Sequence, residues 1–436
     1  MKRLTSLLTT AGVICSLCAG LTGCGSSNET AAGGVNATAS DTAETAGATA
    51  APENKPAAPL PESPVKKIKI GLICLHDETS PYDQNFISSL DKVKGELGMS
   101  DNQIVIQRNI PESDICKETA KELAANGCDI IFADSFGHEP YLLEAAKEYP
   151  NVQFCHATGT LAHTEKLPNF HDAFAAIYQG RYLAGIAGGM KINEMIETGK
   201  ITADQAVIGY VGSYSYAEVI SGYTAFYLGA KSVCPSVTMK VQFTGSWYDE
   251  AAERDAAQTL IDQGCILISQ HADSMGAPSV CEEKGVPNIS YNGSTTDKCP
   301  NTFIVSSKIN WAPYFEYVIN MTIYGDKLDY DWVGTLSTNS VQLTPLNYGV
   351  AAEGTKEALD AASEKLGEGT LHVFDTSTFT VEGKTLSSYM ADVDTDDAYT
   401  PDTEVISDGY FHESEYRSAP YFNLNIDGIT QLNTKF

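Results

Sequence analysis

The sequence predicts an α/β protein with two lobes, each built on a doubly wound parallel sheet, and a ligand cleft between them. Apolar runs of strand length alternate with amphipathic helical segments along most of the chain, which is the pattern of parallel sheets with right-handed crossovers. The alternation completes one series and then starts again, which indicates two such units. A chain of 436 residues, 43% of them hydrophobic, is long enough for two cores and excludes global disorder.

The first 64 residues are expected to lie outside this fold. Lys2 and Arg3 precede a short apolar stretch, which indicates a secretory signal peptide because the stretch is too short to span a membrane. It ends in Leu21-Thr22-Gly23-Cys24, which resembles a bacterial lipobox. The resemblance implies cleavage before Cys24 and a lipid on its thiol. We therefore expect a signal peptide over residues 1–23 and a lipid-anchored flexible tether, rich in Ala, Thr, Gly, Ser and Pro, over residues 24–64.

The first series of elements follows the tether. Its strands have the continuous apolar runs of buried parallel strands, and its helices have apolar residues at helical spacing. We expect strands over residues 65–75, 103–107, 128–133 and 152–157, and helices over residues 85–97, 114–126 and 139–149.

The second series begins with a long apolar helix whose glycines and alanines permit close packing. We expect helices over residues 173–190, 217–231 and 250–263, and strands over residues 206–212, 238–244, 265–269 and 286–292. Beyond residue 346 the pattern weakens, and we expect a helix over 351–366 and strands over 370–374 and 379–381. The acidic run 392–402 has parts of a calcium loop but lacks its glycine and terminal glutamate, so we interpret it as a solvated loop.

The loops that follow the strands form the expected binding site, because open parallel sheets bind ligands beyond the carboxyl ends of their strands. These loops are rich in aromatic and polar residues. An aromatic pair can hold a flat ring between its faces while carboxylates and amides bond to the ring's edge. For any single residue, an ordinary polar turn or an aromatic cap on a sheet remains the alternative. The candidate ligand-binding residues are Tyr82, Asp83, Asn85, Phe86, Asp134, Ser135, Phe136, Tyr214, Trp247, Tyr248, His271, Asp273 and Asn292.

Composition and motifs narrow the function classes. The balance of 28 basic and 56 acidic residues gives a net charge of -28, which disfavours nucleic acid as a partner. Asp134, His271 and Asp273 are the obvious group for acid–base catalysis. The chain has no nucleophile elbow, P-loop or dinucleotide-binding glycine motif. We therefore expect a binding protein without a cofactor rather than an enzyme.

Eight cysteines remain beyond the signal peptide and the expected lipid site. Several lie in apolar runs, where a thiol packs as a small hydrophobic group. We expect mostly free, buried thiols, with Cys281 and Cys299 as the first pair to check for a disulfide. No Cys/His pair has the spacing of zinc ligands, so no metal site is expected.

Several stretches resemble the basic membrane lipoprotein family, the substrate-binding components of ABC importers related to purine nucleoside receptor lipoproteins. They are Lys69-Ile70-Gly71 with Ser80-Pro81-Tyr82-Asp83-Gln84-Asn85-Phe86, residues 144–154, Gln179-Gly180-Arg181-Tyr182-Leu183-Ala184-Gly185, and residues 208–212, 241–249 and 260–265. The resemblance implies a type I periplasmic-binding-protein fold, with two lobes that are joined by three crossovers and close on the ligand. It also implies an ABC permease and ATPase as partners, with membrane contact through the lipid anchor only. We expect a monomer at the extracytoplasmic face of the cell membrane.

For the lobes of this fold, we expect residues 65–165 and about 293–335 in the first and residues 166–292 and about 336–385 in the second. Residues 386–436 are expected to form a C-terminal extension that packs on the body.

The resemblance also suggests roles for single residues. Tyr82 and Asp83 stand at the family's first-loop aromatic and polar positions, and Trp247 stands at the position of the opposing aromatic. Asn292 replaces an acidic residue that binds ribose, while Asp273 supplies a carboxylate from another loop. We therefore expect a planar heterocyclic ligand, with a purine nucleoside or nucleobase favoured. Another aromatic solute such as a flavin, an enzyme acting on nucleosides, and a surface lipoprotein without a small ligand remain alternatives.

Overall fold

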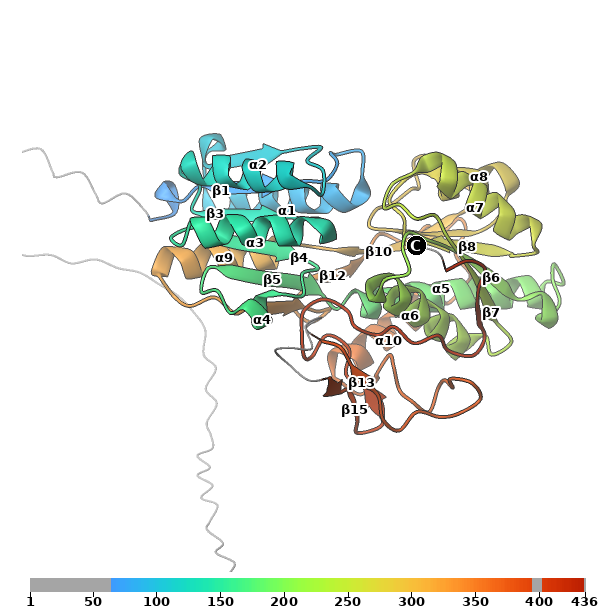
Figure 1. Ribbon diagram of the computed structural model, residues 1–436. Coiled ribbons are helices and arrows are strands. Elements are labelled where there is room, and N and C mark those ends of the chain that lie inside the picture. Colours follow the sequence, from blue (N-terminus) through green and yellow to red (C-terminus); the bar gives the residue numbers. More distant parts are fainter. Residues whose placement is uncertain (1–63, 394–401, 435–436) are drawn as a thin grey trace, which may run out of the picture. The chain divides into compact units, whose positions relative to one another are not determined.

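The computed structural model describes residues 64–393 and 402–434 of the chain. The expected signal peptide, the lipidation site Cys24, the tether up to residue 63 and most of the acidic run lie outside the described residues. Two large sheets organise the described part, one of six strands and one of seven (Figure 1). Helices accompany each sheet, and we call each sheet with its helices a lobe.

The first lobe contains a parallel sheet in the order β11-β5-β4-β3-β1-β2. Its strands are β1 (Ile70–Ile73), β2 (Ile104–Gln107), β3 (Ile130–Ala133), β4 (Gln153–Ala157), β5 (Phe170–Ala175) and β11 (Asp331–Gly334). Its helices are α1 (Pro81–Leu97), α2 (Asp114–Ala125), α3 (Glu139–Glu148), the short α4 (Ala162–Glu165) and α9 (Ala312–Tyr324).

The second lobe contains a sheet in the order β12-β10-β9-β8-β6-β7-β17, parallel except for β12, which runs antiparallel to β10. Its strands are β6 (Val207–Gly212), β7 (Thr238–Phe243), β8 (Leu267–Gln270), β9 (Asn288–Tyr291), β10 (Phe303–Ile309), β12 (Val341–Leu343) and β17 (Ile429–Gln431). Its helices are α5 (Ile177–Glu197), α6 (Ala217–Val233), α7 (Glu250–Asp262), α8 (Gly276–Lys284) and α10 (Thr355–Gly367).

Shorter elements complete the described chain. The 3-10 helices are η1 (Pro64–Lys67), η2 (Asp101–Gln103), η3 (Phe136–His138) and η4 (Ala203–Gln205). The strand pairs β13 (Met390–Ala391) with β14 (Thr403–Glu404), and β15 (Ile406–Ser407) with β16 (Tyr410–Phe411), lie in the C-terminal segment.

Local sequence explains where helix α1 begins and ends. The Ser80 hydroxyl accepts a hydrogen bond from the Asp83 backbone N–H at 3.3 Å, which satisfies a donor that the first helical turn leaves unpaired. Pro81 at the first helical position has the backbone angle that a helix requires. Gly98 ends the helix at a φ of 65°, a conformation that costs glycine little. The helix begins four residues earlier than the expected residue 85, so it carries Tyr82 and Asp83.

Helices α5 and α6 pack closely, as the small residues of the first of them predict. A Cβ on Gly185 would lie 2.0 Å from the carbonyl oxygen of Phe226, and one on Gly229 would lie 2.0 Å from that of Tyr182. The two backbones therefore approach at positions where a side chain would clash. The expected helix over residues 173–190 begins instead at Ile177, because residues 170–175 form the buried strand β5.

The chain passes between the lobes three times, between β5 and α5, between β10 and α9, and between β11 and β12. The lobe boundaries differ from the expected ones in two places. β5 pairs with β4 and so lies in the first lobe. β10 pairs with β9 and so lies in the second lobe, not in the first. Both strands adjoin a crossover, where periodicity does not show which sheet a strand joins.

The expected strands over residues 370–374 and 379–381 were wrong. In this region only isolated bridges join Asp375 to Tyr410 and Val381 to Lys384. Val373, Phe374 and Phe379 are nevertheless buried in the core of the second lobe. Their apolar character therefore reflects burial of a loop rather than strand pairing.

The C-terminal segment contacts both lobes. Its strand β17 adds to the second sheet beside β7. The Ser418 backbone N–H and hydroxyl both donate to Asp331 Oδ1, at 2.8 and 2.7 Å, and Asp331 belongs to first-lobe strand β11.

Other expectations concern thiols and membranes. All eight cysteines in the described residues are free and buried, as expected for most of them, and Cys281 is not bonded to Cys299. They are Cys74, Cys116, Cys128, Cys155, Cys234, Cys265, Cys281 and Cys299.

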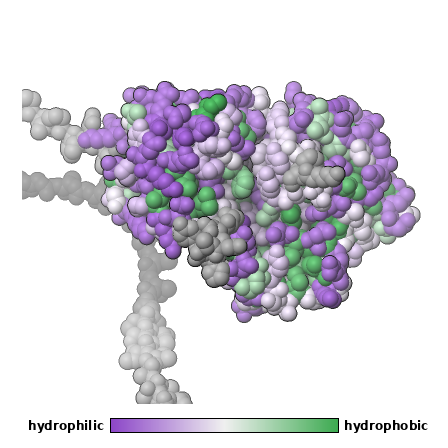
Figure 2. Space-filling view, viewed as in Figure 1, coloured by the Kyte–Doolittle hydropathy of each residue, from purple (hydrophilic) through white to green (hydrophobic). Residues whose placement is uncertain are grey.

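In the described residues, no helix combines the length and the apolar character that crossing a membrane requires. Figure 2 shows hydrophilic residues over much of the first-lobe surface on the face drawn.

Candidate functional site

A cavity of about 370 Å³, including its open mouth, lies between the two lobes. Its lining comes from the loops and helix starts that follow strands, as expected for parallel sheets. The first lobe contributes Leu75, His76, Tyr82, Ser135, Phe136 and Thr158, and the second contributes Glu218, Trp247, His271, Asp273 and Tyr291.

Aromatic side chains from both lobes line this cavity. Tyr82 is held by its hydroxyl, which donates to the backbone carbonyl of Asp134 at 2.7 Å. Trp247 lies edge-on to Tyr214, with ring centroids 5.0 Å apart. Tyr214 in turn stacks on Tyr216 at 4.9 Å with an interplanar angle of 8°. The Trp247 ring is thus supported by an aromatic layer of its own lobe.

Polar groups of the second lobe provide hydrogen-bonding capacity. His271 Nε2 lies 3.3 Å from Glu218 Oε1, and burial lowers the pKa of His271 although Glu218 opposes the shift. Asp273 Oδ1 accepts from the Asn292 side-chain amide at 3.4 Å. Burial, together with the nearby charge of Asp83, raises the pKa of Asp273 well above its usual value. A ligand that donates a hydrogen bond to this buried carboxyl group would therefore stabilise its ionised form.

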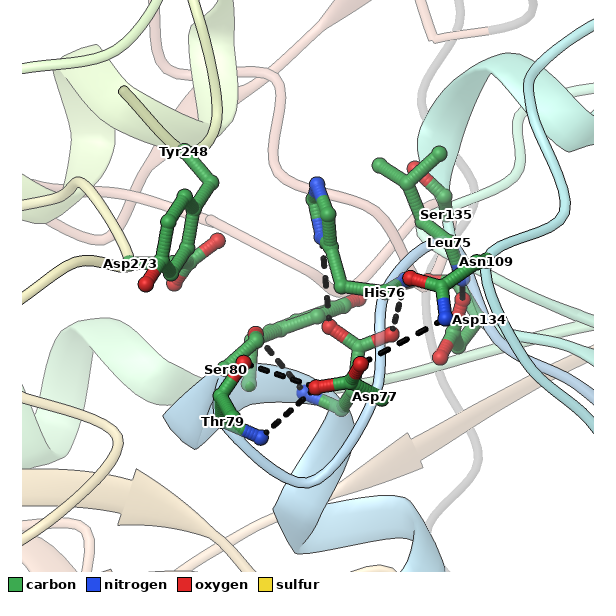
Figure 3. A network of polar contacts seen from close by, with 12 residues as sticks. Leu75, His76, Asp77, Thr79, Ser80, Asn109, Asp134, Ser135, Tyr248 and Asp273 are labelled. Atoms are coloured by element: carbon green, nitrogen blue, oxygen red, sulfur yellow. Dashed lines mark hydrogen bonds and ion pairs between the residues drawn. The ribbon is translucent and has the colours of Figure 1, made fainter. Parts of the chain in front are cut away.

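The two lobes touch around the cavity. The Asn85 side-chain amide of the first lobe donates to the backbone carbonyl of Asn292 in the second at 3.1 Å. Phe136 lies against Tyr216 with ring centroids 5.3 Å apart. His76 faces Tyr248 with centroids 5.4 Å apart, and Figure 3 shows Tyr248 and Asp273 opposite the His76 loop.

Six of the candidate residues line the cavity, namely Tyr82, Ser135, Phe136, Trp247, His271 and Asp273. Four others lie at its margin without lining it. Asn85, Tyr248 and Asn292 take part in the contacts between the lobes or in the bond to Asp273, and Tyr214 supports Trp247.

Three candidates are structural. Phe86 is fully buried in the core of the first lobe and stacks on Trp311 with centroids 4.3 Å apart. Asp83 Oδ1 accepts from the His76 backbone N–H at 2.8 Å, and Asp134 Oδ1 accepts from that of Leu75 at 3.0 Å. The loop after β1 is therefore fastened by both carboxylates. Figure 3 shows Asp134 beside Leu75. In this structure none of these three side chains lines the cavity, and all three are buried.

Five lining residues were missing from the candidates: Leu75, His76, Thr158, Glu218 and Tyr291. Four of them lie in or beside the expected strand-end loops, where the sequence does not distinguish an inward side chain from an outward one. Glu218 is in the first turn of α6. An acidic residue is common there, so nothing in the pattern singled it out.

In the part of the chain that the structure describes, two groups of buried side chains could hold a metal ion. Cys74, Asp83 and Asp134 form one group, and Glu139, His156 and Asp172 form the other. Within each group, one ligand atom per residue lies within 4.8 Å of the others.

Comparisons with known proteins agree with this architecture. Residues 75–369 match the family described as ABC transporter substrate-binding protein PnrA-like. A purine-binding protein of Brucella abortus is 31% identical over 253 residues, which are 57% of this chain and 67% of that protein. A putative ABC transporter glucose-binding protein of Haloferax volcanii is 30% identical over 260 residues, which are 59% of this chain and 62% of that protein.

Among solved structures, an ABC transporter solute-binding protein from Conexibacter woesei superimposes with a TM-score of 0.57 at 20% identity. The superposition covers 70% of this chain and 98% of that one. The family match confirms the resemblance inferred from the sequence, and the superposition confirms the type I periplasmic-binding fold. The matched family and this structural neighbour are solute-binding proteins, not enzymes.

Proposed function

Since this chain belongs to the PnrA-like family of ABC transporter substrate-binding proteins, we propose that it captures a planar heterocycle, a purine nucleoside or nucleobase, for an ABC permease. The cavity between the lobes is the proposed site. Tyr82 and Trp247 hold the ring, and the polar residues of the second lobe bond to its edge.

The observation that carries this proposal is the supply of aromatic rings from both lobes to a single cavity. Tyr82 and Phe136 come from the first lobe, and Trp247 and Tyr291 from the second. Flat ligands gain from contact with ring faces. Glu218, Asp273 and the neutral imidazole of His271 offer acceptors and a donor to the edge of a nitrogen heterocycle. The purine-binding relative from Brucella abortus supports the same ligand class.

The proposed place of action is the extracytoplasmic face of the cell membrane. The lipobox-like ending Leu21-Thr22-Gly23-Cys24 supports lipid attachment at Cys24. The segment up to residue 64 then serves as the tether between the membrane and the binding lobes. In this arrangement the protein delivers its ligand to permease and ATPase components while remaining anchored.

Ligand identification tests the proposal most directly. Protein purified without added ligand is denatured, and the released small molecules are identified by mass spectrometry. Calorimetric titration of ligand-free protein then compares adenosine, guanosine, inosine and their free bases with riboflavin and glucose. We expect a purine to bind most tightly and to be recovered unchanged. Binding of glucose in preference to every purine would contradict the proposal and favour the chemistry named for the Haloferax volcanii relative.

Anchoring is tested separately with the single thiol that is expected to carry the lipid. Cys24→Ser is expected to move the protein from the membrane fraction to the soluble fraction, because the anchor requires that sulfur. Cys281→Ser serves as the matched control, since Cys281 is buried in the body of the protein. A Cys24→Ser protein that stays in the membrane fraction would contradict lipid anchoring.

A further inference from the structure

We propose that Glu139, His156 and Asp172 form a binding site for one divalent metal ion of the Zn²⁺ or Mn²⁺ type. The three side chains come from three elements of the first lobe, the start of α3, strand β4 and strand β5. All three are buried, with 4% of Glu139 and none of His156 or Asp172 exposed. One ligand atom of each lies within 4.8 Å of the other two.

The hydrogen bonding of His156 leaves a lone pair on its Nδ1 available to a metal ion. Its Nε2 lies 2.7 Å from the backbone carbonyl oxygen of Ser135. A carbonyl oxygen only accepts hydrogen bonds, so Nε2 carries the proton and Nδ1 of the neutral ring does not. Nδ1 is fully buried, has no hydrogen-bond partner and lies 3.9 Å from Asp172 Oδ1. A backbone carbonyl that accepts from one ring nitrogen, and so fixes the tautomer, is typical of metal-binding histidines.

The two carboxylates are each fastened at one oxygen. Glu139 Oε1 accepts from the backbone N–H groups of Thr160 and Leu161, both at 2.7 Å. Asp172 Oδ2 accepts from the Ala162 N–H at 2.9 Å, while Asp172 Oδ1 is buried without a partner. Backbone donors thus orient both groups, and a free carboxylate oxygen and a free imidazole nitrogen face each other.

The charges around the group also fit a cation. Within residues 64–393 and 402–434, no lysine or arginine forms a direct ion pair with Glu139 or Asp172, and the charge of Arg417 acts on Glu139 only from a greater distance. Two buried carboxylates that lack such a partner are costly unless a proton or a cation compensates them. Gly159 packs closely against these atoms, since a Cβ there would lie 2.0 Å from Asp172 Oδ1 and 2.6 Å from His156 Nδ1, so a side chain at this position would clash with the group.

The donor set indicates the kind of metal. One imidazole nitrogen with carboxylate oxygens suits Zn²⁺ or Mn²⁺ better than Ca²⁺, which prefers six to eight oxygens. Spacing along the sequence could not reveal this site, since the ligands lie 16 or more residues apart and belong to one helix and two strands. A second cavity is lined in part by Thr158 and Thr160, which flank Gly159, and by Arg417.

The alternative group of Cys74, Asp83 and Asp134 is less suited. Burial raises the pKa of the Cys74 thiol far above its usual value, with Asp134 and Asp83 adding to the shift. This group offers no imidazole nitrogen, and its thiol must lose a proton before it can bind a metal.

The test measures metal binding by the purified protein itself. The protein is treated with a chelator, dialysed, and titrated with ZnCl₂ and MnCl₂ by calorimetry, and bound metal is counted by mass spectrometry. We expect one ion per chain for at least one of the two metals and a higher melting temperature with that metal. Asp172→Asn keeps the size of the side chain and an acceptor for Ala162, and we expect it to weaken binding ~10-fold or more.

Matched variants locate the ion. His171→Gln changes the neighbouring residue on β5, whose ring nitrogens are both occupied by Asp329 and Gln153 at 2.9 and 2.8 Å, and should leave binding intact. Glu139→Gln replaces Asp172→Asn if the latter fails to fold. Absence of stoichiometric Zn²⁺ or Mn²⁺ from the wild-type protein would overturn the proposal. So would a metal that Asp134→Asn removes and Asp172→Asn does not. Because none of these readouts involves the solute, failure here leaves the proposed transport function untouched.

Discussion

In the first lobe, the carboxylates that follow β1 and β3 bind their own backbone, whereas in the second lobe the carboxylates at strand ends line the cavity. Asp83 and Asp134 accept from the N–H groups of His76 and Leu75. Glu218 and Asp273 instead face the cavity. Position at a strand end therefore does not decide whether a carboxylate meets ligand. The loop after β1 has free N–H groups to satisfy, and the nearest carboxylates satisfy them.

The same contrast appears within helix α1. Tyr82 and Phe86 are one turn apart, and their rings touch edge to face at 5.1 Å. Tyr82 lines the cavity, while Phe86 is packed between Phe132 and Trp311 in the core. Two residues one helical turn apart thus have different roles, since Tyr82 lines the cavity and Phe86 packs in the core. A mutation of Tyr82 should mainly change ligand affinity, and a mutation of Phe86 should mainly change the free energy of unfolding.

The largest expected effect is the loss of stability when Phe86, the core residue of this pair, is replaced. Phe86→Ala removes a fully buried ring and should lower the free energy of unfolding by about 3–5 kcal/mol, because the cavity left behind cannot refill. Urea unfolding followed by tryptophan fluorescence measures the loss. Tyr82→Ala is the matched control. It should lower the free energy of unfolding less than Phe86→Ala does, and it should weaken ligand binding more. A Phe86→Ala protein of normal stability with weakened ligand binding would place Phe86 in the site.

A smaller loss of stability is expected where a carboxylate fastens the loop. Asp134→Ala leaves the Leu75 N–H without its acceptor, at a cost of about 1–3 kcal/mol. Chemical unfolding measures this difference as well. Asp273→Ala is the comparison in the second lobe, since its Oδ1 accepts only a long bond of 3.4 Å from Asn292. If both variants lose stability equally, the distinction drawn between the lobes does not hold.

The sequence predicted most of the fold because its strands are continuous apolar runs separated by helices of the right length. Among the strands of the two large sheets it missed β5, β10, β11, β12 and β17. The first four adjoin the crossovers, and Ser306, Ser307 and Lys308 dilute the apolar pattern of β10. The cavity between the lobes lies at the strand ends, where the sequence placed the candidate site. The sequence could not tell which strand-end side chains turn inward, because that depends on which backbone N–H groups the tertiary structure leaves unpaired. Asp134 and Asp273 look alike in sequence and differ only in this respect.

A further prediction concerns Trp247, which lines the cavity from the second lobe. Trp247→Ala should weaken ligand binding about tenfold, which corresponds to about 1.4 kcal/mol. Stability should change little, because the ring is only half-buried and rests on Tyr214 at the surface of its lobe. Calorimetry with the co-purified ligand and a thermal melt give the two values. Unchanged affinity with a lowered melting temperature would mean that Trp247 is a structural residue.

The smallest expected effect is a pH dependence of binding that Asp273 produces. Burial, with Asp83, Glu253 and Glu218 adding negative charge, raises the pKa of Asp273 in the ligand-free protein. A ligand N–H that donates to this carboxyl stabilises the ionised form and lowers its pKa, so binding releases a proton. Affinity should therefore rise with pH between the pKa of the bound state and that of the free state, and level off above the latter. The slope cannot exceed one proton, or about tenfold per pH unit.

Titrations in buffers of different ionisation enthalpy measure the released proton directly. Asp273→Asn should abolish both the proton release and the pH dependence, and it should also weaken binding at high pH, where the wild-type group accepts as a carboxylate. Glu253 is the necessary control, because burial raises its pKa to about 7 even though Ser274 hydrogen bonds to it. Glu253→Gln should leave the proton release in place. If Glu253→Gln removes the proton release and Asp273→Asn does not, the titrating group is Glu253 and Asp273 does not bond to the ligand.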